Sequence, residues 1–104
     1  MPSQKVDTRI LAMSEFLHVF VTPRAGQTRE QLEVKLNLAL DWLRYGEGLY
    51  VVYTKSDVAT WKRRLREFVK PDGFLFICRL DIKKCQGWMS REFWEWIKEK
   101  NGSG

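Results

Sequence analysis

The sequence has few of the residues that build metal centres. Among its 104 residues are two cysteines, Cys78 and Cys85, and a single histidine, and no Cys-x-x-Cys pair occurs. This content argues against a zinc site. There is also no signal peptide, and no apolar run approaches the roughly 18 residues of a membrane span. We therefore expect a cytoplasmic protein that does not enter a membrane.

Motifs of catalysis are equally scarce. The chain has no glycine-rich phosphate loop, no serine-nucleophile motif and no paired-carboxylate motif. His18 lies between apolar neighbours, and the sequence places no acid–base partner beside it. We predict no catalytic residue, no metal site and no cofactor, although carboxylates distant in sequence could still meet in space.

What the sequence does contain is typical of one folded domain. Hydrophobic residues make up 44% and charged residues 30% of the chain. Five Trp, three Tyr and six Phe are a heavy aromatic load for this length. Some of them are expected at the surface or in an interface, because Trp is rarely buried completely. We predict a flexible arm over residues 1–12, a single domain over 13–100 and a tail over 101–104.

The first half of this domain is predicted to begin with a strand at 16–22 and a helix. Thr28 and Gln31 fit a capping box at the start of that helix. A strand at 49–54 follows, and a short strand at 42–45 is expected to pair with it as a hairpin. The buried face of the helix is expected to hold Leu32, Leu36, Ala39, Leu40 and Leu43.

The second half adds two helices and a strand. Ser56 or Asp57 caps the first of these helices, a strand lies within 72–81, and Ser90 caps a last helix that ends near Lys100. The predicted order is βα(β)βαβ with an additional C-terminal helix. This order favours an α+β, ferredoxin-like sandwich with helices on one face of a small sheet.

The second helix carries the densest basic cluster of the chain. Lys62, Arg63, Arg66 and Lys70 recur on the side opposite its apolar residues. One interpretation is a solvated helix face, and the other is a set of phosphate contacts to nucleic acid. The formal net charge of +5 is compatible with both, because 13 acidic residues are interspersed with 18 basic ones.

The strand within 72–81, DGFLFICRLD, contains Gly-Phe-x-Phe, which is half of the base-stacking signature of RNA-recognition motifs. In that motif the strand lies between the two helices and a basic residue precedes the glycine. Here the strand follows the second helix and Asp72 precedes Gly73. Position and charge both disagree with the motif.

The three apolar strands nevertheless raise a packing question. Each is apolar on both faces, whereas two helices cover only one face of a sheet. A large uncovered apolar patch is rare on a monomer, so the last helix or a second copy of the chain must cover the other face. We predict a homodimer. The expected interface residues are Phe16, His18, Phe20, Phe74, Phe76 and Trp94.

Four segments carry a resemblance to a known family: GLYVVYTKSD at 48–57, WKRRL at 61–65, PDGFLFICRL at 71–80 and FWEWI at 93–97. In this order they resemble the small ferredoxin-like proteins related to the CRISPR adaptation nuclease subunit, including the bacterial SinR-like group. The resemblance implies a ferredoxin-like fold, a homodimer joined through the sheets, and a defence or mobile-element setting.

The nuclease members of that family hold a metal with an Asp at the end of the first strand. Val21 and Thr22 occupy the matching positions here, and neither is a carboxylate. Nuclease activity is therefore not carried over. The function we expect is a small non-catalytic homodimeric module that acts through protein–protein interaction. The alternatives are a nucleic-acid-binding protein that uses the basic helix and a degenerate metal-dependent nuclease.

Overall fold

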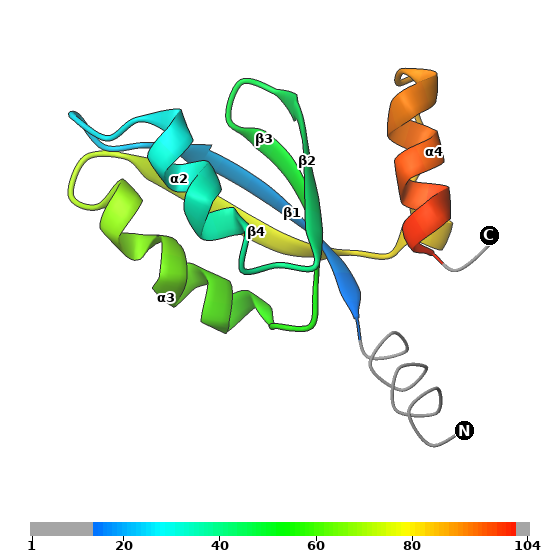
Figure 1. Ribbon diagram of the computed structural model, residues 1–104, viewed down its shortest axis with the longest axis horizontal. Helices are drawn as coiled ribbons and strands as arrows, with labels where there is room; N and C mark the ends of the chain where they lie inside the picture. The colour runs from blue at the N-terminus through cyan, green and yellow to red at the C-terminus, as the bar shows by residue number, and fades with distance from the viewer. Residues whose placement is uncertain (1–13, 102–104) are drawn as a thin grey trace.

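Four antiparallel strands form one sheet, with two helices on one face and a third helix at one end of it (Figure 1). The computed structural model describes residues 14–101. The predicted arm at 1–12 and residues 102–104 of the predicted tail lie outside this range. In chain order the elements are β1 (Glu15–Thr22), α2 (Arg29–Leu36), β2 (Asp41–Gly46), β3 (Leu49–Thr54), α3 (Val58–Val69), β4 (Phe74–Leu80), the short 3-10 helix η1 (Ile82–Lys84) and α4 (Arg91–Lys100).

The strands lie side by side in the order β2-β3-β1-β4. All four predicted strands are present, and β2 pairs with β3 as the expected hairpin. Gly48 takes a φ of 70° in the turn between them, a conformation that residues with a Cβ rarely adopt. The result is a small α+β fold in which β4 and β2 are the edge strands.

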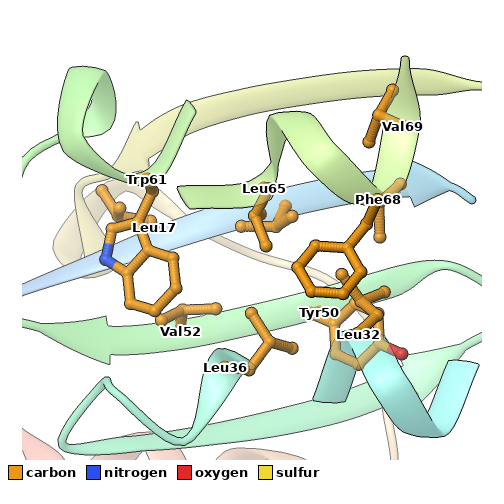
Figure 2. Packing of buried hydrophobic residues seen from close by; sticks show 11 residues of the cluster. Leu17, Leu32, Leu36, Tyr50, Val52, Trp61, Leu65, Phe68 and Val69 are labelled. Carbon is orange, nitrogen blue, oxygen red and sulfur yellow. The ribbon is translucent and has the colours of Figure 1, made fainter. Parts of the chain in front are cut away.

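One face of the sheet forms the main core with α2 and α3 (Figure 2). Alternate residues of β1, among them Leu17 and Val19, are completely buried there. Trp61 of α3 packs among them and donates its indole N–H to Thr54 Oγ1 over 3.0 Å. Because this hydrogen bond satisfies the one polar atom of the indole, the large ring can be buried without leaving an unpaired donor.

The helix α2 is shorter than the sequence pattern predicts. Its capping box is present, since Thr28 Oγ1 accepts from the Gln31 N–H over 3.2 Å, but the helix ends at Leu36. Leu40 is 47% exposed and Leu43 belongs to β2, opposite Val51 of β3. The predicted buried face beyond Leu36 is therefore wrong, except that Ala39 still packs against the core. Pairing with β3 outweighs the helical spacing of these leucines.

The helix α4 covers part of the second face, which we call the outer face. Ser90 caps it as predicted, accepting from the Phe93 N–H over 3.2 Å. Its buried Ile97 packs on Phe16 of β1 and on Tyr53 of β3. Figure 1 shows α4 at the end of the sheet where β4 ends, away from α2 and α3. Among residues 14–101, no helix combines the length and apolar character needed to cross a membrane.

Candidate nucleic-acid interface

The basic side of α3 is fixed by the burial of the opposite side. Asp57 caps the helix and accepts from the Thr60 N–H over 2.9 Å. From there Trp61, Leu65 and Phe68 recur at helical spacing and are buried against the sheet and α2 (Figure 2). Val69 is also buried, and the positions on the opposite side of the helix face outward. Those outward positions include the basic residues that the sequence singled out: Lys62, Arg63, Arg66 and Lys70.

These four cations line one groove between α3 and the edge strand β4. Its volume is about 810 Å³. Residues 74–77 of β4 form one wall, and Val58, Ala59, Val69 and Gly73 supply the rest of the uncharged lining. No acidic residue is part of the lining. The groove is therefore a concave and strongly positive surface at the edge of the sheet.

The charges in this groove are not neutralised locally. None of the four cations forms an ion pair with a carboxylate within residues 14–101. Among the described residues, the Arg63 guanidinium donates only to the hydroxyl of Thr60, over 3.3 Å. By contrast, Glu67 of the same helix is paired with Lys35 of α2, at 3.7 Å. Glu67 thus lies toward α2, and Asp57 at the start of α3 is the carboxylate that interacts electrostatically with Arg63, without an ion pair.

Part of the outer face remains open next to this groove. Residues opposite one another in neighbouring strands share a face, and Phe20 of β1 lies opposite Phe76 of β4, while Thr22 lies opposite Phe74. Phe20, Phe74 and Phe76 are 36%, 66% and 61% exposed. We call these three residues the aromatic row. Phe74 and Phe76 are also among the residues that line the groove, so the row and the groove meet at the edge strand β4, with the rings on the outer face and the cations on the α3 side.

The other predicted interface residues lie elsewhere. Phe16 is only 6% exposed, because Trp96 of α4 packs over it with ring centroids 6.1 Å apart. Trp94 is half-buried and contacts Phe93 edge-on, with ring centroids 5.1 Å apart. The last helix therefore covers this end of the outer face. The open aromatic row lies at the opposite end of β1 and β4.

His18 lies between these two ends of the outer face. Its Nε2 is hydrogen-bonded to the phenol of Tyr45, and burial lowers the pKa of the imidazole. Burial also raises the pKa of the Tyr45 phenol, as does the neighbouring Cys78. No carboxylate hydrogen-bonds to His18 within the described range 14–101. An imidazole held by a phenol has its hydrogen-bonding needs met at that nitrogen, which agrees with a structural role for His18.

The end of β1 presents no carboxylate to a metal ion. Val21 is buried in the core and donates its backbone N–H to Gly48 O over 2.9 Å, while Thr22 is exposed. Over the described part of the chain, no group of three or more His, Cys, Asp or Glu residues is arranged to hold a metal.

Sequence reasoning missed the residues that complete the groove. Leu75 and Ile77 line its wall and pack against the main core, while Val58 and Val69 contribute from α3. The alternation in DGFLFICRLD placed Leu75 and Ile77 on the face opposite Phe74. It could not show that this face lies beneath the basic side of α3, because that depends on how the helix crosses the sheet.

Comparison with protein-family models, with curated proteins and with solved structures gives no match.

Proposed function

We propose that this protein binds nucleic acid through the groove between α3 and β4. One observation carries the proposal: four cations without ionic partners line a single groove that contains no acidic residue. A groove of this charge attracts a polyanion, and guanidinium and ammonium groups are the usual donors to phosphate oxygens. Contacts of this kind hold the backbone of a nucleic acid without selecting its base sequence.

The number of cations sets the expected salt dependence. If Lys62, Arg63, Arg66 and Lys70 each neutralise one phosphate, raising the salt from about 50 to about 200 mM should weaken binding about 50-fold for a single strand. The same change should weaken binding to a duplex about 150-fold. A much shallower dependence would mean that fewer of these groups touch phosphate.

The test is a charge reversal in the groove. The triple substitution Arg63→Glu, Arg66→Glu and Lys70→Glu changes exposed positions on the outward side of α3 and leaves the buried side intact. Retention on heparin and binding of a fluorescent DNA at low salt should be lost. Circular dichroism should show the same helix and strand content as the unchanged protein. Binding that survives the triple substitution would refute the proposal.

A matched control separates the groove from net charge. Lys83, Lys84 and Lys98 are exposed, lie outside the groove, and form no ion pair within residues 14–101. Changing these three lysines to Glu alters the formal charge by the same amount. Binding should fall only modestly in this control, because phosphates that lie in the groove are largely screened from distant charges. Equal losses in both triple variants would leave the net charge of the protein as the cause.

The fold that we propose to underlie this activity is a ferredoxin-like sandwich with an additional C-terminal helix. Two features support it: the β-α-β-β-α-β order of β1 to β4, and the placement of β1 and β3 at the centre of an antiparallel sheet. The proposal agrees with the resemblance to the SinR-like proteins. A defence or mobile-element setting rests on that resemblance alone.

A homodimeric interaction module is a second candidate, favoured by the aromatic row. Exposed large apolar groups that are adjacent in space are typical of protein interfaces. A stable dimer would bury about 800 Å² on each partner and cover Phe20, Phe74 and Phe76. Light scattering at micromolar concentration would then give twice the chain mass of 12.4 kDa. A constant monomer mass over a hundredfold concentration range would exclude this candidate.

A further inference from the structure

The aromatic row presents three phenylalanine rings to solvent beside the positive groove. Phe74 and Phe76 are two positions apart on β4, so they point to the same side with a spacing of about 7 Å. Phe20 lies opposite Phe76 on the adjacent strand β1. The nearest covering element, α4, packs at the other end of these strands, on Phe16 and Leu80. Within residues 14–101, no helix covers the row.

We infer that the aromatic row stacks the bases of a single-stranded nucleic acid whose phosphates lie in the groove. This inference rests on the function proposed above and names its substrate class. Binding sites for single strands combine a cationic groove that follows the backbone with aromatic side chains on which bases stack. Both parts occur here on the two sides of the edge strand β4 and meet at its edge, because Phe74 and Phe76 belong to the row and are among the residues of the groove lining.

The row selects single strands because the flat faces of the bases are hidden inside a duplex. In a double helix each base is stacked on its neighbours, so its flat faces cannot reach a protein ring. In a single strand the bases can turn outward while the phosphates remain near Arg63 and Arg66. The spacing along β4 lets successive bases contact Phe74 and Phe76 separately. Duplexes would use only the cationic groove.

This surface differs from an RNA-recognition motif in the strands that supply the rings. That motif stacks bases on the two central strands of its sheet. Here the row is formed by central β1 and edge strand β4, while α4 packs on the central strand β3 through Tyr53. The mismatch in strand position seen in the sequence is consistent with this arrangement. The Gly73-Phe74 pair lies at the edge of the sheet, beside α3.

The experiment compares ring, aliphatic and truncated side chains at Phe76 and Phe74. The probes are an oligothymidylate and an oligouridylate of about ten nucleotides, within the usual site size of such proteins, and a DNA duplex of the same length. Phe76→Ala and Phe74→Ala should each weaken binding of the single strands about 5- to 150-fold, the range that stacking of one base supplies. Phe76→Leu should behave like the Ala variant, whereas Phe76→Tyr should retain binding. Duplex binding should be unchanged in all four variants.

Two controls make the result interpretable. Leu38→Ala removes another exposed apolar side chain, 60% exposed and outside the groove lining, and should change no affinity. The two single-stranded probes separate the sources of the ligand, since equal affinities mean that the sugar is not recognised and a difference identifies RNA or DNA. All variants change exposed positions, so the thermal unfolding temperature should remain close to that of the original protein.

Several outcomes would overturn the inference. If Phe76→Leu retains binding, the contact is merely apolar and not base stacking. If the protein sediments at twice 12.4 kDa and Phe76→Ala converts it to a monomer, the row is a dimer interface. If wild-type protein binds the duplex as tightly as the single strands and the Phe variants change neither, base stacking fails while the proposed groove function stands. If it binds none of the probes, the groove function fails as well.

Discussion

The substitution Ile97→Ala should detach α4 from the outer face of the sheet. Ile97 is the one buried residue of α4 and is 5% exposed. It packs with Phe16, Val51 and Tyr53 in a cluster separate from the main core. No backbone hydrogen bond joins α4 to a strand within residues 14–101. The contacts that hold this helix in place are therefore side-chain contacts: the packing of this cluster, and the bonds of Asp41 Oδ2 with Lys100 at 2.8 Å and with Trp96 at 3.1 Å.

The expected magnitude follows from the size of the lost contact. Removing three carbons from a buried Ile typically costs about 2–5 kcal/mol. We expect the lower end, about 2 kcal/mol, because α4 lies at the end of the sheet and can shift to fill the space. That value corresponds to a change of about 30-fold in the docking equilibrium. Once undocked, a helix of this length is marginal in water and should unfold.

Native-state hydrogen exchange measures this opening directly. Amides of residues 91–100 should exchange about 30-fold faster in Ile97→Ala, while those of β1 and α3 keep their protection. The matched control is Glu95→Ala on the exposed side of the same helix, for which a change below about 0.5 kcal/mol is expected. Two results would refute the reasoning. One is unchanged exchange in α4, and the other is an equal acceleration in α3, which would mean that α4 and the core unfold together.

Two further predictions concern the ends of the sheet. Burial raises the pKa of Asp41, but hydrogen bonds from Lys100 and two tryptophans outweigh this effect and leave the pKa below its ordinary value of 3.8. The ionised Asp41 carboxylate therefore stabilises the fold fully above pH 3.8, and this stabilisation is lost as the pH falls through the lower folded-state pKa. The acid unfolding curve of Asp41→Asn should accordingly be less steep than that of the original protein. A Cβ at Gly73 would lie 2.2 Å from the carbonyl oxygen of Thr22, whereas one at Gly87 would meet nothing within 4 Å. In urea denaturation, Gly73→Ala should lower the free energy of unfolding by at least about 2 kcal/mol and Gly87→Ala by less than about 0.5 kcal/mol. Equal urea midpoints for the two variants would contradict this prediction.

The sequence alone determined the local structure of this protein well, because local structure depends on neighbouring residues. The capping residues Thr28, Asp57 and Ser90 each accept a hydrogen bond from the first turn of the predicted helix. Short apolar runs bounded by turn residues predicted the strands, and the 3.6-residue period predicted the buried side of α3. The basic cluster of α3 could be identified for the same reason, since the exposed side of a helix is the complement of its buried side.

The end of α2 could not be predicted in this way. The leucines at 36, 40 and 43 continue a helical spacing, yet the chain leaves the helix after Leu36. Hydrogen bonds to β3 decide the conformation there, including one from the Leu40 N–H to Tyr53 O at 2.9 Å. A pairing partner more than ten positions away in sequence is invisible to any local pattern.

Only the tertiary structure decided how the two faces of the sheet are used. Patterning showed that both faces are apolar, but it could not show that α4 would cover Phe16 and leave Phe20, Phe74 and Phe76 open. Nor could it place the basic side of α3 beside the free edge of β4. These relations depend on strand order and on the angles at which helices cross the sheet. Such angles result from packing between segments distant in sequence, which no single segment specifies.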